Sequence, residues 1–351
     1  MKVLITGAAG FIGSNLVHLL SQNRPNWKLT ALDALTYAGN LKNLEPLLGQ
    51  NKIQFARLDI NDTAAVQAFL SREKYDLVFH LAAESHVDRS IQSAAEFIKT
   101  NVLGTENLLA ASRSSGVGRF VHISTDEVYG SLGATGFFTE ETHLDPTSPY
   151  AASKAASDLI ALAYHKTHKL PVMVTRCTNN YGPYQFPEKF IPLFIANALE
   201  DKPLPLYGDG MNVRSWLHVK DHCAALLKVA ESGRPGEVYN IGPNQLQPVM
   251  TSSGNVDINR EVPNLEVANQ LLQILDKPKS LIKFITDRLA HDFRYAVDTS
   301  KIEHELGWHA EISFADGLKD TVAWYLNNRA WWEEIRSGDY REYYRKQYGE
   351  K

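Results

Sequence analysis

Residues 1–13 read MKVLITGAAGFIG, a short apolar run followed at once by three spaced glycines. Val3–Ile5 has the composition of a buried strand, and residues 11–20 have the apolar spacing of a helix. Between them, Gly7 permits a tight turn, Gly10 lets the backbone approach a phosphate, and Gly13 allows close packing of helix and strand. The stretch therefore predicts a strand-turn-helix unit that holds a dinucleotide at the helix N-terminus.

The first half of the chain continues this alternation of short apolar runs and amphipathic stretches. Further strand-like runs occupy 28–32, 53–58, 77–81, 120–123 and 172–176, and helical patterns occupy 63–70, 94–112 and 148–169. Strands separated by helices form right-handed crossovers and a parallel sheet. We predict an α/β fold, with a doubly wound parallel Rossmann sheet and a smaller C-terminal substrate-binding region.

Domain boundaries follow from where this alternation stops, near residue 179, where prolines and irregular segments begin. We expect a dinucleotide-binding Rossmann domain over 1–178, with 215–240 returning to it. The substrate-binding region then covers 179–214 and 241–330, and a helical tail rich in aromatic and charged residues covers 331–351. The polar stretch 245–263 is interpreted as a surface excursion: a disordered loop in preference to a second binding surface or a pocket lid.

The overall composition excludes several classes of protein. Hydrophobic residues make up 44% and charged residues 22% of the chain, which predicts a folded protein, and a net charge of -4 argues against a nucleic-acid partner. Cys177 and Cys223 are expected to be buried thiols, and no Cys/His spacing predicts a metal site. No apolar window is long enough to span a bilayer, and the N-terminal run is too short for a signal peptide, so we expect a cytoplasmic protein without a membrane partner.

The residues that end the next strands predict the cofactor. Asp33 lies twenty residues after Gly13, where a carboxylate can accept hydrogen bonds from an adenosine ribose. A carboxylate repels the 2′-phosphate of NADP, so NAD is the predicted cofactor. Asp59 is expected to reach the adenine. For both carboxylates the alternative is an Asp that caps its own turn. Residues 81–83, LAA, end another strand with small side chains against which a cofactor can lie.

Tyr150 and Lys154 lie one helical turn apart on one face of a predicted helix. A phenol has a pKa near 10 and is a poor base at neutral pH, but a neighbouring ammonium favours the phenolate. The same lysine can hold the nicotinamide ribose. The spacing alone is common, and its alternative is a surface cation packed along a ring; its place two elements after a dinucleotide strand favours a catalytic pair.

At these motifs the chain resembles the extended short-chain dehydrogenase/reductase family over nearly its whole length. The stretch 124–130, STDEVYG, is most similar to the dTDP-glucose 4,6-dehydratases, because epimerases of the family usually have small residues where Asp126 and Glu127 stand. Other matching stretches are 82–90 (AAESHVDRS), 179–183 (NNYGP), 187–190 (PEKF) and 287–288 (DR).

This resemblance implies the removal of water from dTDP-glucose by an enzyme that keeps its NAD. Tyr150, with Thr125 beside it, takes the O4 proton while hydride leaves C4. Glu127 then removes the C5 proton, and Asp126 protonates the departing O6. The acid role requires a raised pKa at Asp126, which burial and a nearby carboxylate would supply. Hydride finally returns to C6.

The same resemblance assigns the binding residues. Cofactor contacts fall to Gly7, Gly10, Phe11, Ile12, Gly13, Asp33, Thr36, Asp59, Ile60, Leu81, Ala82, Ala83, Thr100, Tyr150, Lys154 and Asn180. Substrate contacts fall to Ser85, Thr125, Asn179, Lys189, Phe190, Pro205, Tyr207, Arg214, Asn244, Arg288 and His291. A guanidinium suits bidentate phosphate binding, although a solvated salt bridge is the alternative for any one arginine.

Two departures from the family affect this list. Leu289 and Ala290 replace the usual Pro-Gly, which bears on Arg288 and His291, and about fifteen extra residues follow Gly242, so the nucleotide-binding Asn is Asn244 or Gln245.

In the resembling proteins the helices corresponding to 94–112 and 148–169 form a four-helix bundle across a dimer axis, so a homodimer is predicted. Three other readings remain open. The same chemistry could serve another nucleotide sugar such as UDP-glucose. The acidic pair argues against a 4-epimerase, and the presence of both Tyr150 and Lys154 argues against a catalytically silent dinucleotide sensor.

Overall fold

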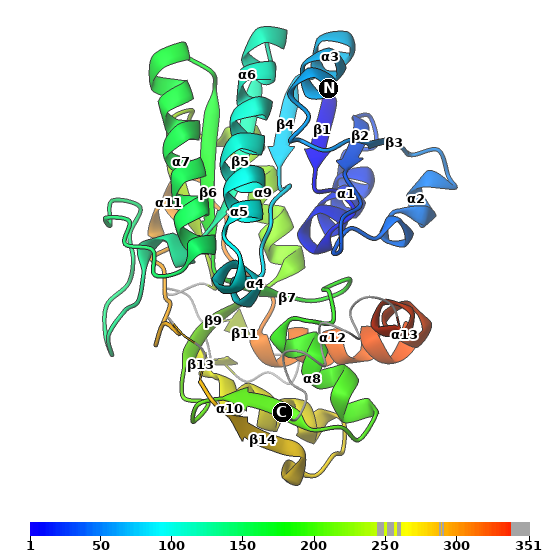
Figure 1. Ribbon diagram of the computed structural model, residues 1–351, viewed down its shortest axis with the longest axis vertical. Coiled ribbons are helices and arrows are strands. Elements are labelled where there is room, and N and C mark those ends of the chain that lie inside the picture. Colours follow the sequence, from blue (N-terminus) through cyan, green and yellow to red (C-terminus); the bar gives the residue numbers. More distant parts are fainter. Residues whose placement is uncertain (244–248, 251–255, 258–260, 288, 290, 338–351) are drawn as a thin grey trace.

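The computed structural model describes residues 1–243, 249–250, 256–257, 261–287, 289 and 291–337. It shows a larger half built on a parallel sheet and a smaller half of helices and short strands beneath it (Figure 1). Asn244, Gln245, Arg288 and Ala290 lie outside the described residues, as does the tail beyond 337. None of the helices in the described ranges is long and apolar enough to cross a membrane.

The larger half contains one seven-stranded sheet in the order β10-β6-β5-β4-β1-β2-β3, and all its pairs are parallel. This order confirms the predicted doubly wound fold. From β1 the strand order runs outward in both directions, so the switch point lies between β1 and β4. The strands are β1 (Lys2–Thr6), β2 (Lys28–Asp33), β3 (Ile53–Arg57), β4 (Leu77–His80), β5 (Arg119–Thr125), β6 (Val172–Cys177) and β10 (Val238–Ile241).

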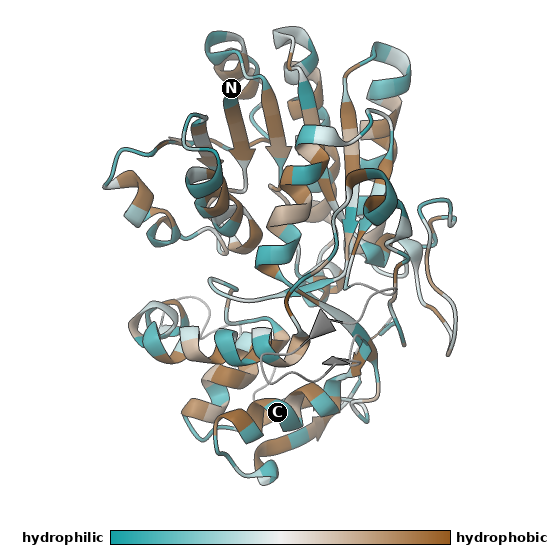
Figure 2. Cartoon of the chain, turned by 180° about the vertical axis from the view of Figure 1, so that it is seen from behind, coloured by the Kyte–Doolittle hydropathy of each residue, from teal (hydrophilic) through white to brown (hydrophobic). Residues whose placement is uncertain are grey.

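Helices cover both faces of this sheet, so neighbouring residues on a central strand enter different cores. Val3 and Ile5 pack with α1 and α9, whereas Leu4 packs with α3 and α6. Figure 2 shows the resulting hydrophobic strands between helices with hydrophilic outer faces. The elements of this half are α1 (Phe11–Asn23), η1 (Leu41–Asn43), α2 (Glu45–Leu48), α3 (Thr63–Glu73), α4 (Val87–Gln92), α6 (Thr105–Ser115), η3 (Asp126–Tyr129), α7 (Pro149–His168), α9 (Val219–Ser232) and α11 (Ser300–Leu306).

The predicted helix over 94–112 is helical but not uniform. It consists of α5 (Ala95–Phe97), the π-helix η2 (Ile98–Gly104) and α6. Asn101 is buried inside the π-helix, where its amide exchanges hydrogen bonds of 2.8 and 3.0 Å with the backbone N–H and C=O of Glu84. A π-helix within an α-helix is typical of functional sites, and this one fixes the loop that follows β4.

The smaller half has its own core, which includes Trp216, Tyr325 and Trp332. Its strands form short sheets, β13-β9-β7 and β14-β8, and β11 pairs with β12. The elements are β7 (Asn179–Tyr181), α8 (Phe190–Leu199), β8 (Leu204–Tyr207), β9 (Val213–His218), β11 (Val249–Met250), β12 (Val256–Asp257), β13 (Glu261–Pro263), α10 (Asn264–Ile274), η4 (Lys279–Leu281), β14 (Ile282–Ile285), α12 (Phe314–Asn327) and α13 (Arg329–Ser337).

The chain crosses between the halves more often than the predicted domain ranges allow. Within 215–240, α9 and β10 belong to the larger half, but most of β9 pairs inside the smaller one. Ile302 and Trp308 pack in the core of the larger half, although 241–330 was assigned to the substrate-binding region. Both cysteines are buried free thiols, as predicted.

Candidate active site

A cavity of about 390 Å³ opens at the carboxyl ends of the parallel strands. Ligands of doubly wound sheets bind at this edge, where the strand order reverses. Its walls include every residue that the sequence assigned to the cofactor: Gly7, Gly10, Phe11, Ile12, Gly13, Asp33, Thr36, Asp59, Ile60, Leu81, Ala82, Ala83, Thr100, Tyr150, Lys154 and Asn180.

The glycine turn has the geometry that its spacing predicts. Gly7 has a φ of +66°, and a Cβ there would lie 2.7 Å from the backbone nitrogen of Ala82. A Cβ on Gly13 would lie 2.1 Å from the Gly7 oxygen, so helix and strand pack too closely for any side chain. Gly10 is the N-cap residue of α1, and no side chain caps that helix. The first N–H groups of α1 have no acceptor in the helix, which suits an anion in the cavity.

Asp33 is buried at the end of β2, with its two carboxylate oxygens in separate hydrogen bonds. One oxygen accepts from the N–H of Ala9 at 2.9 Å, and the other accepts from the N–H of Leu35 at 2.8 Å. Each oxygen keeps a further lone pair for a ribose hydroxyl. The turn-capping alternative therefore describes part of what Asp33 does, and the remaining lone pairs fit a dinucleotide.

Two other predicted cofactor residues, Asp59 and Asn180, already make hydrogen bonds to other groups of the protein. The Asp59 carboxylate accepts from the N–H of Asn61 at 2.9 Å, which is a turn cap. The Asn180 amide donates to the Thr178 carbonyl at 2.9 Å, and its oxygen lies 2.9 Å from Nδ1 of His222. Both residues line the cavity, but both polar atoms of the Asn180 side chain already have partners within the protein.

Several buried polar atoms on the cavity walls have no hydrogen-bond partner among the described residues. They include atoms of Ser124, Asp126, Thr178, Asn179 and Gln185. Burying an unpaired polar atom costs about 1–3 kcal/mol. Several such atoms around one cavity indicate that it is built for a polar ligand.

The acidic pair lies in η3, directly after β5. Thr125 ends the strand and caps this turn, accepting from the N–H of Glu127 at 3.3 Å. Asp126 is only 1% exposed, whereas Glu127 lines both the first cavity and a second one. The two carboxyl groups therefore face the same space as Tyr150 and Lys154.

The environment of Asp126 shifts the pKa of its carboxyl group. Burial raises the pKa of Asp126 well above its ordinary value, and the Glu127 carboxylate raises it further, while Arg214 acts in the opposite direction. This shift favours the protonated form of Asp126, which is the form that can donate a proton. This agrees with the acid role that the resemblance implied.

Tyr150 differs from the expectation that Lys154 would favour its phenolate. Burial raises the pKa of Tyr150 well above its ordinary value, and Glu127 raises it further; the hydrogen bond with Thr125 acts in the opposite direction. The Lys154 ammonium donates instead to the carbonyl of Ile123 at 2.8 Å. The phenol is neutral in the protein alone, so its activation needs additional positive charge in the cavity.

Replacing Lys154 with Met should stabilise the protein by about 1–3 kcal/mol at neutral pH. Burial lowers the pKa of Lys154 from 10.5 to about 8. Below pH 8 both the folded and unfolded states carry the charge, and the folded state bears the full cost of burying it. As the pH rises from about 8 to 10.5, the folded lysine loses its proton first and the cost disappears. Urea unfolding across this range measures the effect. Lys166→Met, at the exposed end of α7, is the control, and equal stabilisation by both variants would contradict the prediction.

A second cavity of about 180 Å³ adjoins the first and shares with it Ser85, Glu127, Asn179 and Lys189, among others. The remaining described substrate residues, Phe190, Pro205, Tyr207, Arg214 and His291, also line it. Arg214 is buried, stacks 4.4 Å from the centre of the Tyr295 ring and donates to the Asp292 carbonyl at 2.9 Å. A guanidinium held in this way presents a fixed cation to a phosphate.

The sequence analysis missed some residues of this site. Asn264, the first residue of α10, lines the second cavity with Arg214, and Glu188 lines both cavities. The signal for Asn264 was a polar residue at the start of a helix, but it lies beyond the extra segment, whereas Asn244 and Gln245 directly follow Gly242. Within the described residues, no group of His, Cys, Asp and Glu side chains could hold a metal.

The chain is similar to well-characterised proteins along almost all its length. A family model described as GDP-mannose 4,6 dehydratase matches residues 4–321. The dTDP-glucose 4,6-dehydratase of Streptomyces niveus is 48% identical over 343 residues, 97% of each chain. The crystal structure of DesIV (dTDP-glucose 4,6-dehydratase) from Streptomyces venezuelae, with NAD and TYD bound, superimposes with a TM-score of 0.88 at 49% identity, covering 95% of this chain and all of that one. The dTDP-glucose 4,6-dehydratase of Bacillus anthracis, solved with NAD, gives 0.86 at 46%, covering 95% and 99%.

A glycine turn at the switch point of a parallel sheet, facing a Tyr-Lys pair one helical turn apart, defines the extended short-chain dehydrogenases/reductases. The paired acids after β5 and the extent of the similarity narrow this class. The chain belongs to the dTDP-glucose 4,6-dehydratase family.

Proposed function

We propose that this protein is an NAD-dependent hydro-lyase that converts dTDP-glucose to dTDP-4-keto-6-deoxyglucose and water. One observation carries the proposal: the buried Asp126, whose carboxyl pKa is raised, lines the first cavity next to Glu127, and Glu127 lines both cavities. Elimination of water needs one group that removes a proton from C5 and another that gives a proton to O6. A 4-epimerase has no use for such a pair.

The first cavity fits NAD. The N-terminus of α1 suits the pyrophosphate, and Asp33 suits an unphosphorylated adenosine ribose. The unpaired polar atoms of Thr178 and Asn179 could form hydrogen bonds with the cofactor. When bound, the cofactor would supply a hydride acceptor for C4 and a positive charge beside the Tyr150 phenol as NAD⁺, and a hydride donor for C6 once it is reduced. Lys154 can hold the nicotinamide ribose from the same wall.

The second cavity fits the nucleotide sugar. Arg214 faces the diphosphate, and Asn264 is available to the nucleotide. The base is assigned as thymine because the relatives that match this chain along its length act on dTDP-glucose by name. UDP-glucose is the alternative substrate, and the catalytic residues would treat its sugar in the same way.

The proton transfers follow from where the side chains lie. The Tyr150 oxygen takes the O4 proton, with Thr125 positioning O4. Glu127 takes the C5 proton, which the new C4 carbonyl has made acidic, and Asp126 gives its proton to O6 so that water leaves. Glu127 returns a proton to C5 at the end of the cycle. Tyr150 then releases the proton that it took from O4, and Asp126 takes up a proton in place of the one that it gave to O6.

The direct test is incubation of the purified protein with dTDP-glucose and, separately, with UDP-glucose, with no cofactor added. Because the cofactor is regenerated in each cycle, it should stay bound, and a 4-keto product should form from dTDP-glucose. Mass spectrometry of the product distinguishes loss of water from epimerisation. No keto product from either substrate would refute the dehydratase function, and equal rates would refute the choice of base.

We also propose that the protein forms a homodimer through α7 and the helix that contains η2. Ile98, Leu103 and Leu159 are 52%, 57% and 58% exposed on these two elements, which pack against each other. Exposed apolar side chains gathered on one helix pair mark an interface. A cytoplasmic location remains a prediction that cell fractionation would test.

Charge on this surface should separate the subunits. Leu103→Glu combined with Leu159→Glu would bury two carboxylates in the interface, so light scattering should give the mass of a monomer where the unchanged protein gives that of a dimer. Phe284→Glu is the control, because Phe284 is 59% exposed on β14, away from these helices. A monomeric unchanged protein would contradict the proposal.

A further inference from the structure

The C-terminal helix reaches the glycine turn through one buried side chain. Trp331 in α13 donates its indole N–H to the Asn43 side-chain oxygen at 2.8 Å. The Asn43 amide nitrogen donates to the carbonyl of Ala9 at 2.9 Å. Asn43 is only 1% exposed; its bond to Ala9 is buried, and the bond from Trp331 is partly buried.

Ala9 lies between Gly7 and Gly10 and is held on both sides. Its N–H donates to Asp33 at 2.9 Å, and its carbonyl accepts from Asn43 and from the N–H of Asn40 at 3.0 Å. The peptide plane that joins Ala9 to Gly10 is thereby fixed directly before the first turn of α1. The orientation of the N–H groups offered to a pyrophosphate depends on this plane.

Trp331 sets which way the Asn43 amide faces. An indole N–H can only donate, so the amide oxygen must face Trp331 and the amide nitrogen must face Ala9. Without that donor, the amide could turn and place its oxygen against the Ala9 carbonyl, where two acceptors repel. Trp331 therefore acts on the glycine turn through Asn43, as a positioning residue.

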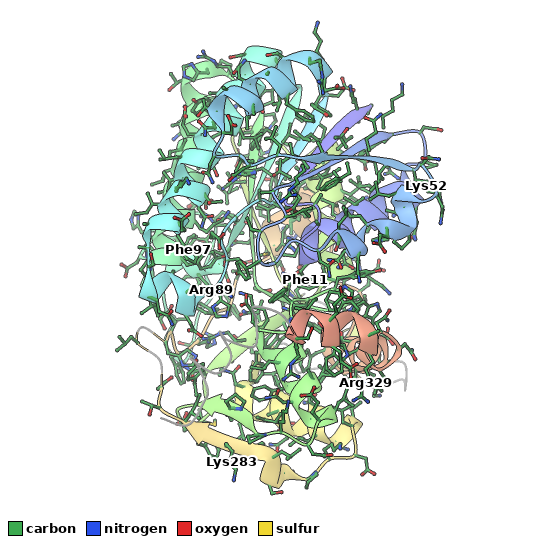
Figure 3. The ribbon with its side chains drawn as sticks, turned by 45° about the vertical axis from the view of Figure 1, so that its right-hand side comes forward. Phe11, Lys52, Arg89, Phe97, Lys283 and Arg329 are labelled. Atoms are coloured by element: carbon green, nitrogen blue, oxygen red, sulfur yellow. The ribbon has the colours of Figure 1, made fainter. Side chains whose placement is uncertain are left out.

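Because α13 belongs to the smaller half, this contact also joins the two halves of the protein. Trp332, next along the helix, is fully buried in the core of the smaller half, and Trp331 packs against that core. Figure 3 shows α13, labelled at Arg329, beneath the larger half near Phe11. The ion pair of Lys42 with Glu334 joins the same elements, but its side chains are 47% and 61% exposed, so it contributes little.

We propose that Trp331 and Asn43 form a clasp by which the smaller half holds the glycine turn closed on NAD. The clasp rests on the proposed function, because only an enzyme that regenerates its cofactor in each cycle must keep it bound. It makes retention of NAD depend on the C-terminal helix, which belongs to the half that binds the substrate.

The test measures release of NAD from the full-length protein. Protein loaded with radiolabelled NAD⁺ is mixed with excess unlabelled NAD⁺, and the retained label is followed in time. Trp331→Phe keeps an aromatic ring but removes the N–H, and it should release label about fivefold to tenfold faster; Asn43→Ala should release it at least as fast. Trp324→Phe is the control, because the Trp324 ring makes an edge-to-face contact with Trp331 in the same aromatic cluster.

Two further readouts separate the clasp from general stability. The thermal midpoint of the NAD-free protein should be the same for Trp331→Phe and Trp324→Phe. Turnover of Trp331→Phe should rise toward saturation as NAD⁺ is added, whereas a general loss of structure would lower it at every NAD⁺ concentration. Release by Trp331→Phe at the unchanged rate, or equally fast release by Trp324→Phe, would overturn the clasp. Unchanged protein that makes product but holds no label would also overturn it, and unchanged protein that does neither would refute the proposed function itself.

Discussion

A variant carrying both Asp126→Asn and Glu127→Gln will oxidise its substrate and go no further. The amides keep the shape of the acids, but neither can remove the C5 proton or protonate O6. Tyr150 and Lys154 are unchanged, so oxidation at C4 should proceed. We expect formation of the 4-keto-6-deoxy product to fall by about 10²–10⁴-fold.

Mixing this variant with dTDP-glucose should produce the absorbance of reduced nicotinamide without release of product. Glu141→Gln is the matched control, because this exposed carboxyl group lies in the loop that follows the acidic pair. Normal turnover by the double variant would show that other groups perform the elimination, and the assigned roles would then be wrong.

The second large effect is expected from Tyr150→Phe, which should abolish oxidation as well as elimination. Removing the hydroxyl leaves no acceptor for the O4 proton, and the loss of turnover should again be about 10²–10⁴-fold. No reduced nicotinamide should appear on mixing with dTDP-glucose, in contrast to the acid-pair variant. Tyr164→Phe is the control on the same helix, since its hydroxyl binds Glu106 rather than facing the cavity. Accumulation of reduced cofactor in Tyr150→Phe would assign the proton transfer to another residue.

The glycine turn and the alternating strands could be predicted from sequence because each depends on local pattern. The path of the chain beyond residue 179 could be predicted only in part. The return of 215–240 was expected, whereas α11 returns to the larger half through contacts that no local periodicity records. The π-helix at 98–104 was also missed. It is accompanied by hydrogen bonds between Asn101 and Glu84, and the periodicity of 94–112 contains no sign of that contact.

The site residues were predicted from motifs, but their chemistry depends on burial. A raised pKa at Asp126 was expected because the acid role implied by the resemblance requires it, and burial beside Glu127 raises it. For Tyr150 the spacing to Lys154 predicted a lowered pKa, whereas enclosure of the phenol beside Glu127 raises it. Asn264 was missed because the extra segment displaced it in the sequence, while the pairing of β13 with β9 brings it back to the cavity.

The return of the chain to its first half also bears on how the protein is made. Residues 1–178 leave the ribosome before the segments that complete their half, and domains generally begin to fold as they emerge. The edge of the large sheet is completed by Val238–Ile241, its core by Ile302 and Trp308, and the contacts of the glycine turn by Trp331. Nascent chains that stall before these points would leave the β6 edge and apolar surface uncovered, so pauses in translation before residue 238 should favour aggregation of this fold.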